Sequence, residues 1–237
     1  MNSKLNLPRH VAVIMDGNRR WARLNNLSNE SGHSNGIDTL VNIAKIASEI
    51  GIEYLTFYSF SKENWNRGKN EITYLMELMA NFESQYLDKI IRKNIKIKVI
   101  GDIETLSNEQ KKIINNVEQK TKQNNGMNLI TAFNYSGRDE LVRAIREIIN
   151  EIGEGNLSRK DVDESTVTKY LDTRKIPDPD LIIRTGGEKR ISNFLIWQSV
   201  YSEYVFVDDY WPDFKTDTFM CALKEYANRE RRYGGGI

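Results

Sequence analysis

The sequence has little of what disulfide frameworks and zinc centres need. It contains one cysteine, Cys221, and two histidines among 237 residues. A single cysteine excludes an internal disulfide, and one cysteine with two histidines supplies too few ligands for a zinc site of the usual type. Because chains without disulfides are typical of the cytoplasm, we expect a cytoplasmic protein.

Long apolar runs and an excess of one charge are missing as well. No stretch approaches the roughly 20 residues of a membrane-spanning helix, and the first residues, MNSKLNLPRH, lack the apolar core of a signal peptide. The 34 basic residues nearly balance the 33 acidic ones. No overall field attracts nucleic acid, so no nucleic-acid partner is expected, and any anion site must come from a local cluster of charge.

The motifs of three common enzyme classes are also absent. Neither GxGxxG nor GxxxxGK[ST] occurs, which disfavours dinucleotide and P-loop nucleotide binding, and there is no GxSxG of a serine hydrolase. No segment rich in proline, glycine and serine divides the chain. At this length we predict one domain that spans residues 1–237.

The sequence does contain a regular alternation of short apolar runs and amphipathic stretches. Residues 11–15 are apolar without alternation, as in a central parallel strand covered on both faces. The alternation predicts an α/β fold with a mostly parallel central sheet flanked by helices. The other predicted strands are 53–60, 95–102, the start of MNLITAFNYSGRDE, 180–184 and SEYVFVD, and the predicted helices are 35–50, 71–93, 108–122, a stretch to about 152, 164–172 and 214–229.

Polar loops follow three of the predicted strands. They are DGNRRW after the first strand, SKENWNR after the second and RTGGEKRIS after the strand at 180–184. In open parallel sheets the ligand crevice lies at the carboxyl ends of the strands, so the three loops are expected to share one cleft. Its charged residues would be the carboxylates Asp16, Glu63 and Glu188 and the cations Arg19, Arg20, Arg67, Arg184, Lys189 and Arg190.

This set of side chains suits a metal-bound phosphate ester. Asp16 can hold a hard cation such as Mg²⁺ through oxygen, and Gly17 lets a ligand approach the backbone. Arg19 and Arg20 offer forked donors that match phosphate oxygens, and the number of cations suits two diphosphates with magnesium at Asp16. Taken alone, however, Asp-Gly-Asn is also a good turn, and any one arginine fits a solvated surface equally well.

Three further polar residues have two interpretations each. Asn64 is either a turn former or a functional side chain, and Trp65 either closes the end of the sheet or takes part in the site. His33, in SGHSNG, is either a proton donor or phosphate ligand, or a cap of the following helix.

Several long segments, in fixed order, resemble the signatures of the cis-prenyltransferases, a family that includes the bacterial undecaprenyl diphosphate synthases. They are HVAVIMDGNRRWA, SGHSNG, FYSFSKENWNR, NYSGRDEL, PDLIIRTGGEKRISNFLIWQSVYSEYVF, WPDF and NRERRYGG, spread from residue 8 to residue 236. The resemblance implies a homodimeric, magnesium-dependent enzyme of isoprenoid biosynthesis. Such an enzyme condenses isopentenyl diphosphate with an allylic diphosphate, here farnesyl or geranyl diphosphate, to a Z-polyprenyl diphosphate. The undecaprenyl type serves as a lipid carrier in cell-wall biogenesis, and such a product implies peripheral contact with a membrane.

The resemblance also implies roles for individual residues. Asp16 matches the essential aspartate at the magnesium and the allylic diphosphate, and Asn64 stands in the place assigned to proton removal. Glu203 matches a second magnesium ligand supplied near the dimer interface, and Arg232-Tyr233-Gly234 resembles an ending that reaches the active site of the partner. The residues that match substrate-binding positions are Gly17, Asn18, Arg19, Arg20, Trp21, His33, Ser61, Glu63, Trp65, Arg67, Arg184, Arg190 and Ser192.

A growing prenyl chain needs an apolar tunnel beside the diphosphate site. The apolar face of 71–93, the stretch 37–50 and the strand residues Phe57, Leu129 and Ile130 would line it, although plain core has the same pattern. In this chemistry magnesium and arginines stabilise the departing pyrophosphate, and a weak base then removes one proton.

The chain departs from the family pattern at Asn29, where the family usually carries an arginine that grips the allylic diphosphate. Either Arg19, Arg23 or Lys62 replaces that contact, or the allylic site is altered. An altered site would suit a short-chain or head-to-middle synthase of the same fold, which gives branched products. Two further hypotheses are a non-catalytic partner subunit, which the retained Asp16 disfavours, and a diphosphate-binding regulatory module, which shares the fold.

Overall fold

All the strands of the sheet run parallel, so their carboxyl ends lie at one edge. The computed structural model describes residues 6–231 and residue 235. Six strands are hydrogen-bonded in the order β3-β4-β2-β1-β5-β6, which confirms the predicted fold class. Their bounds are β1 His10–Ile14, β2 Tyr54–Ser61, β3 Lys96–Ile100, β4 Asn128–Tyr135, β5 Leu181–Arg184 and β6 Glu203–Phe206.

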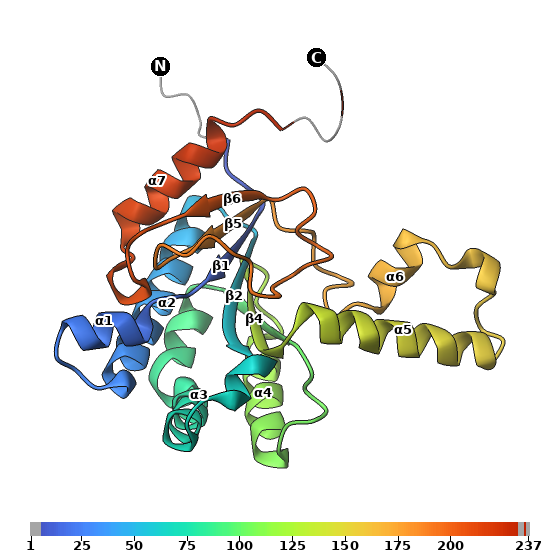
Figure 1. Ribbon diagram of the computed structural model, residues 1–237, viewed down its shortest axis with the longest axis horizontal. Helices are drawn as coiled ribbons and strands as arrows, with labels where there is room; N and C mark the ends of the chain where they lie inside the picture. The colour runs from blue at the N-terminus through green and yellow to red at the C-terminus, as the bar shows by residue number, and fades with distance from the viewer. Residues whose placement is uncertain (1–5, 232–234, 236–237) are drawn as a thin grey trace.

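Helices connect the strands and cover the sheet. Figure 1 shows α1, α2, α3 and α7 on one side, whereas α5 and α6 form an arm that extends away on the other. Within the described residues, no helix is both long enough and apolar enough to cross a membrane. The helices are α1 Asn18–Leu24, α2 Asn29–Ile50, α3 Lys69–Arg92, α4 Asn108–Thr121, α5 Gly137–Gly153, α6 Glu164–Tyr170 and α7 Thr216–Ala227, with 3-10 turns η1 Lys62–Asn66, η2 Arg159–Asp161 and η3 Trp211–Asp213.

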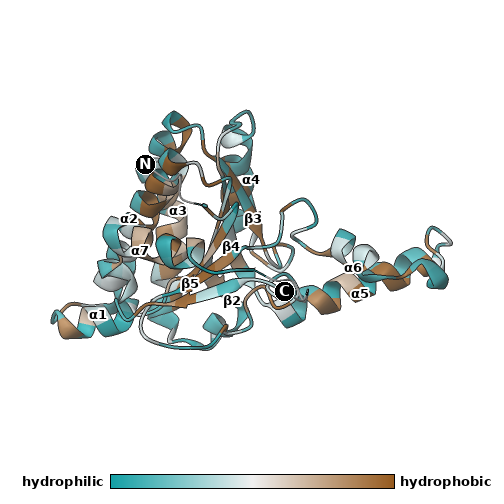
Figure 2. Ribbon diagram, turned by 90° about the horizontal axis from the view of Figure 1, so that it is seen from above, coloured by the Kyte–Doolittle hydropathy of each residue, from teal (hydrophilic) through white to brown (hydrophobic). Residues whose placement is uncertain are grey.

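Two apolar clusters cover opposite faces of the sheet. Val11 and Val13 of β1 pack with residues of α2, α3 and α7, while Ala12 and Ile14 pack on the other face with β5 and the segment after it. Successive side chains of a strand point to opposite faces, so β1 contributes to both clusters. This explains the unbroken apolar run at 11–15. Figure 2 shows the hydrophobic strands of the sheet and helices that carry both hydrophobic and hydrophilic residues.

The structure differs from the sequence-based expectation between the first two strands. Residues 18–24 form a short helix where a loop was expected, and α2 begins at Asn29 rather than at residue 35. The glycines of SGHSNG disfavour a helix locally. In the folded chain they allow helices to pack closely, because a Cβ atom at Gly32 would lie 2.4 Å from the backbone oxygen of Asn18. The other predicted elements end within two residues of the observed ones.

His10, the first residue of β1, joins three parts of the chain. Its Nδ1 lies 2.7 Å from the Pro177 carbonyl and its Nε2 lies 2.7 Å from Thr56 Oγ1. Burial lowers the pKa of His10 from 6.5 to about 4, against a smaller opposing effect of the Pro177 hydrogen bond. The imidazole is therefore neutral at physiological pH.

Acidification from pH 7 to pH 5 is expected to lower the free energy of unfolding by about 2 kcal/mol through His10 alone. The folded-state pKa of about 4 lies below the unfolded value of 6.5, so between these values the unfolded chain binds more protons. The contribution of His10 is fully present above pH 6.5 and is lost as the pH falls toward 4. Urea denaturation at the two pH values measures it. A His10→Gln variant with the full wild-type pH dependence would contradict this assignment.

Candidate active site

Three loops meet at the carboxyl edge of the sheet because their strands are neighbours. β1 pairs with β2 on one side and with β5 on the other, so Ile14 lies opposite both Tyr58 and Arg184. The segments that follow these strands, together with α2 and α3, enclose a polar cavity of about 330 Å³. Its lining residues are Met15, Asp16, Gly17, Asn18, Arg19, Arg20, His33, Tyr58, Ser59, Asn64, Arg67, Leu75, Glu188 and Arg190.

Asp16 lies between two guanidinium groups. Its Oδ2 accepts a hydrogen bond from Arg184 Nη2 at 2.8 Å, and its Oδ1 lies 3.2 Å from Arg20 Nη2. Burial alone would raise the pKa of Asp16, but the two arginines outweigh it and the pKa is lowered. The carboxylate is therefore charged at neutral pH.

Arg184, the last residue of β5, connects the loops that follow β1 and β5. Its side chain is only 4% exposed. Besides its bond to Asp16, its Nη1 donates to the Arg190 carbonyl and, at 2.8 Å, to Ser192 Oγ. One buried cation thus holds both loops beside the cavity.

Thr185 and Tyr210 fix the backbone next to Asp16. Thr185 Oγ1 accepts a hydrogen bond from Asp16 N at 3.0 Å and donates to the Asp16 carbonyl at 2.7 Å. Gly17 has a φ of 108°, and a Cβ atom there would lie 2.6 Å from Tyr210 Cδ1. Arg20 Cζ lies 5.2 Å from the centroid of the same tyrosine ring. Glycine is therefore required at position 17 by both conformation and space.

Glu71, in the first turn of α3, is a site residue that the sequence analysis missed. Its Oε1 accepts a hydrogen bond from Arg67 Nη1 at 2.9 Å and lies 3.1 Å from His33 Nε2, while its Oε2 lies 3.6 Å from Arg19 Nη1. Burial lowers the pKa of His33, although the Glu71 carboxylate opposes the shift. A glutamate in the first turn of a helix is an ordinary terminus signal, so only the tertiary structure reveals this role.

The segment that follows β2 brings two predicted residues to the polar cavity. Asn64 and Arg67 both line it. The Asn64 side chain closes the turn, because its Oδ1 accepts a hydrogen bond from Ser61 N at 3.1 Å. Ser61, the last residue of β2, thus fixes the start of this turn through its backbone N–H.

Glu63 and Trp65, from the same segment, lie outside the residues that line the cavity. Glu63 Oε1 accepts a hydrogen bond from Asn193 Nδ2 at 2.9 Å. Trp65 Nε1 donates to Asn134 Oδ1 at 2.8 Å, and its ring packs against Phe60. In this structure both side chains connect the loop to other elements.

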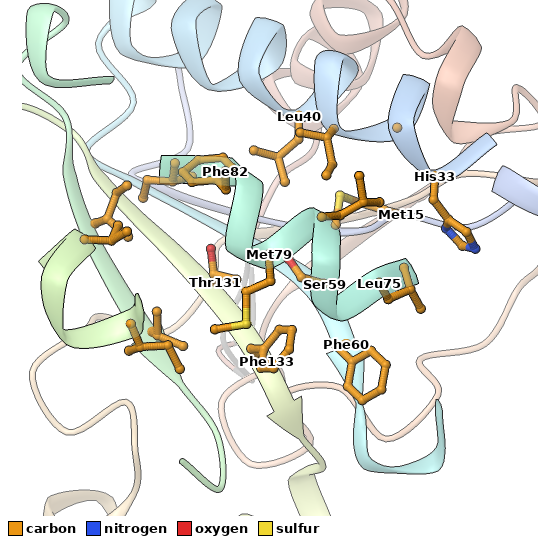
Figure 3. A pocket seen from close by; sticks show the side chains of 18 of the residues that line it. Met15, His33, Leu40, Ser59, Phe60, Leu75, Met79, Phe82, Thr131 and Phe133 are labelled. Atoms are coloured by element: carbon orange, nitrogen blue, oxygen red, sulfur yellow. The ribbon is translucent and has the colours of Figure 1, made fainter. Parts of the chain in front are cut away.

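An apolar cavity of about 180 Å³ adjoins the polar one (Figure 3). The residues that line both cavities are Met15, Asn18, His33, Ser59 and Leu75. Figure 3 shows side chains from α2, α3 and β4 around this space, among them Leu40, Met79 and Phe133. The remaining lining residues are Gly36, Ile37, Leu40, Phe60, Leu78, Met79, Phe82, Ile97, Val99, Ile113, Ile114, Val117, Leu129, Thr131, Phe133 and Trp211.

Of the three strand residues expected at such a cavity, only Leu129 lines it. The expectation was wrong for Ile130, which faces the opposite side of the sheet because neighbouring strand residues alternate. It was also wrong for Phe57, which is fully buried and packs against the Trp211 ring at a centroid distance of 5.6 Å.

Glu203, predicted as a second magnesium ligand, does not meet Asp16 within one chain. It begins β6 opposite Leu181, at the amino end of the strands, whereas Asp16 follows the carboxyl end of β1. Its Oε2 accepts a hydrogen bond from Arg229 Nη1 at 2.7 Å. Joint binding of one ion by Asp16 and Glu203 would therefore require a second copy of the chain.

Two further predicted residues do not line the polar cavity. Trp21 is half-buried in α1, and Lys189 is exposed; neither lines the cavity. The tail Arg232-Tyr233-Gly234 lies outside the described residues.

The carboxylates at the cavity fit a magnesium ion that is bound together with phosphate. In the part of the chain that the structure describes, no three His, Cys, Asp or Glu side chains gather to form a metal site of their own. Magnesium needs no such cage, because it binds through one or two carboxylates together with phosphate and water oxygens. Asp16 supplies one carboxylate, and Glu188, 3.3 Å from Arg20 Nη1, is a second at the same cavity.

The sequence is similar to known prenyltransferases over nearly its whole length. A prenyltransferase family model, described as undecaprenyl diphosphate synthase, matches residues 14–234. The isoprenyl transferase of Staphylococcus haemolyticus is 46% identical over 230 residues, which cover 97% of this chain and 90% of that protein. The ditrans,polycis-undecaprenyl-diphosphate synthase ((2E,6E)-farnesyl-diphosphate specific) of Micrococcus luteus is 44% identical over 229 residues, which cover 97% and 92%.

A solved structure shows the same similarity in three dimensions. It is the lavandulyl diphosphate synthase from Lavandula x intermedia in complex with dimethylallyl diphosphate. The two structures superpose with a TM-score of 0.93 at 35% sequence identity, over 96% of this chain and 98% of that one.

Proposed function

The chain belongs to the undecaprenyl diphosphate synthase family of prenyltransferases, and on this basis we propose that it is a magnesium-dependent cis-prenyltransferase. It condenses isopentenyl diphosphate with an allylic diphosphate, farnesyl or geranyl diphosphate, to a Z-polyprenyl diphosphate. The proposed product is the undecaprenyl type of lipid carrier for cell-wall biogenesis. The name of the Micrococcus luteus relative, which specifies (2E,6E)-farnesyl diphosphate, supports farnesyl diphosphate as the allylic substrate.

The continuity of the two cavities carries the proposal. An allylic diphosphate has an anionic head and an apolar tail. The polar cavity with its arginines adjoins the apolar cavity, and residues such as Ser59 and Leu75 line both. Neither a plain hydrophobic core nor a diphosphate-binding regulatory module needs both kinds of cavity side by side.

In the proposed mechanism, arginines at the cavity stabilise the departing pyrophosphate as the allylic carbon–oxygen bond breaks. Arg20 is held by Glu188 and by the Tyr210 ring, so its guanidinium is in place before charge develops. A guanidinium offers forked donors that match phosphate oxygens. Magnesium, when bound at Asp16, supplies additional positive charge for the same oxygens.

The second substrate, isopentenyl diphosphate, is proposed to bind where Arg184, Arg190 and Ser192 come together. The hydrogen bonds of Arg184 to the other two residues support this placement. The new carbon–carbon bond forms from C4 of this substrate, and one proton is then lost. Asn64 lines the polar cavity, as Arg190 does, and is the residue proposed to assist removal of the proton.

Arg19 is the proposed substitute for the family arginine that is absent at Asn29. Of the three candidates, only Arg19 lines the polar cavity. Lys62 binds two carboxylates elsewhere, which disfavours it for this role. Arg23 is exposed and also lies outside the cavity.

Product analysis tests the proposed function. The purified protein is incubated with magnesium, labelled isopentenyl diphosphate and, separately, dimethylallyl, geranyl or farnesyl diphosphate, and the products are sized after dephosphorylation. Long Z-polyprenols made from farnesyl diphosphate are expected. Magnesium removal by a chelator should stop the reaction, and absence of turnover with every primer would refute the proposal.

A short-chain or head-to-middle synthase is the second candidate. Two observations favour it: the close structural similarity to lavandulyl diphosphate synthase and the asparagine at position 29. Short or branched products from dimethylallyl diphosphate in the same experiment would support this candidate against the first. A long product would partition into lipid, so peripheral membrane contact is predicted only with the first candidate, whereas a cytoplasmic location is predicted with either.

A homodimer is proposed because α5 carries an uncovered apolar face. Val142, Ile145 and Ile149 lie three and four residues apart on this helix and are 45%, 50% and 60% exposed. Figure 1 shows α5 extending away from the sheet, so within one chain little covers this face. Contiguous exposed apolar side chains of this kind mark interaction surfaces.

The Ile145→Glu variant is therefore expected to be monomeric at concentrations where the wild-type protein is a dimer. A charge in the centre of an apolar interface must be desolvated without a partner, which typically costs several kcal/mol. Light scattering coupled to size-exclusion chromatography measures the mass. Glu147→Gln, a change on the same helix outside this face, serves as the control, and a dimeric Ile145→Glu variant would rule out this interface.

A further inference from the structure

The segment after β2 is held by a lysine that takes no part in the proposed chemistry. Lys62 Nζ donates hydrogen bonds to Asp102 Oδ2 and to Asp139 Oδ1, both at 2.7 Å. Asp102 follows β3, and Asp139 lies in the first turn of α5. A single side chain thus connects η1 to two other elements.

The two acceptors are themselves fixed. Asp139 Oδ2 accepts a hydrogen bond from Arg143 Nε at 2.9 Å, and the same guanidinium binds both oxygens of Asp172 at 2.8 and 2.6 Å. Asp102 is buried. Hydrogen bonds between charged partners are about twice as strong as neutral ones, so these fixed carboxylates hold the ammonium group of Lys62 in one position.

Trp65, three residues after Lys62, is connected by hydrogen bonds to Asp102 as well, through Asn134. Its Nε1 donates to Oδ1 of Asn134, and Asn134 Nδ2 donates to the Asp102 carbonyl at 2.7 Å. Asn134 is buried and has a φ of 50°, a left-handed conformation that is uncommon for residues other than glycine. Asn64, between the two attached residues, lines the polar cavity.

We propose that Lys62 is a positioning residue for prenyl transfer, a role that rests on the proposed function: by binding Asp102 and Asp139 it holds Asn64 and Arg67 at the polar cavity. Ordering the loop before substrates bind lowers the entropy that must be lost at the transition state. Because the residues proposed to bind the allylic diphosphate, Asp16, Arg19 and Arg20, follow β1 rather than β2, the loss of Lys62 acts on the chemical step more than on binding of that substrate.

The Lys62→Met variant tests this role. It keeps the apolar stem of the side chain and removes the charge. We expect kcat to fall by about 10- to 100-fold while KM for farnesyl diphosphate changes little. Hydrogen exchange of the amides at 61–67, followed by mass spectrometry, is expected to be at least about tenfold faster. Lys62→Arg, which keeps a cation, should restore most of the activity and the slow exchange.

Lys111→Met is the matched control. The side chains of Lys62 and Lys111 are both 32% exposed, but within residues 6–231 the Lys111 ammonium binds a single carboxylate, Glu104, whose side chain is 92% exposed. This control should leave kcat and exchange of 61–67 unchanged. If Lys62→Met fails to fold, as judged by its melting curve, Asp139→Asn, which removes the charge of one of the two acceptors, is tested in the same way and should give a smaller effect in the same direction.

Each outcome decides the matter. Unchanged exchange in a folded Lys62→Met variant shows that the lysine does not hold the loop, and faster exchange with wild-type kcat shows that holding the loop is irrelevant to the reaction. Lys62→Arg behaving like Lys62→Met contradicts a role for the charge. The exchange experiment needs no turnover, so an inactive wild-type protein refutes the proposed function while leaving the loop contact to be judged by exchange alone.

Discussion

The Asp16→Asn variant is expected to transfer prenyl groups about 1000-fold more slowly than the wild-type protein. The amide keeps the size of the side chain but removes the negative charge between Arg184 and Arg20. The positive charges of the two guanidinium groups are then no longer neutralised by a carboxylate, and the position loses its carboxylate ligand for magnesium. Initial rates with farnesyl and isopentenyl diphosphate over a range of magnesium concentrations measure the effect.

The stability of this variant has to be measured together with its activity. Arg184 is 4% exposed, and removing the charge partner of a buried ion typically destabilises a protein by about 3–5 kcal/mol. A melting curve therefore decides whether lost activity reflects chemistry or unfolding. Asp217→Asn, the same change at an exposed position in the first turn of α7, should leave the activity unchanged and lower the stability by no more than about 1 kcal/mol. Wild-type turnover by a folded Asp16→Asn variant would refute the role of this carboxylate.

The Gly32→Ala variant is expected to lose about 3 kcal/mol of unfolding free energy. The added Cβ atom would lie 2.4 Å from the Asn18 carbonyl oxygen and 3.1 Å from Ala22 Cβ. The first contact is with backbone, so no side-chain rotation relieves it and α1 has to move. Because α1 carries Arg19 and Arg20, prenyl transfer should fall as well. Urea denaturation followed by circular dichroism measures the stability.

Gly153→Ala is the matched control for that experiment. Gly153 is the last residue of α5, and nothing lies within 4 Å of a Cβ atom built there. Alanine has the higher helix propensity, so this variant should be as stable as the wild type or more stable by up to about 1 kcal/mol. If Gly32→Ala gains stability in the same way, the close packing of α1 on α2 is not what glycine provides.

Local patterns predicted most of the architecture. The unbroken apolar run at 11–15 is a consequence of burial on both faces of β1, and helical periodicity located α3 to within two residues. The same patterns failed at the start of α2, where the apolar spacing placed the first helical residue at 35 rather than at 29. The glycines at 32 and 36 disfavour a helix locally, and close helix packing overrides that propensity.

The loops of the site were predictable as a group, but not the direction of each side chain. That the segments after β1, β2 and β5 meet follows from parallel pairing of neighbouring strands. Glu71 and Lys62 act through partners far along the chain, and neither stands out in its own segment. Strand alternation likewise separates Leu129, which lines the apolar cavity, from Ile130, which does not.

By itself, then, the sequence determined the α/β fold, the family and the chemical character of a cleft that contains Asp16 and several arginines. Only the tertiary structure decided which of these side chains share a cavity, that Glu71 lies among His33, Arg19 and Arg67, and that an apolar space adjoins the charged one. Periodicity and signature motifs are properties of neighbouring residues along the chain. Cavities and charge networks arise where segments distant in sequence pack together, and that packing depends on the whole fold.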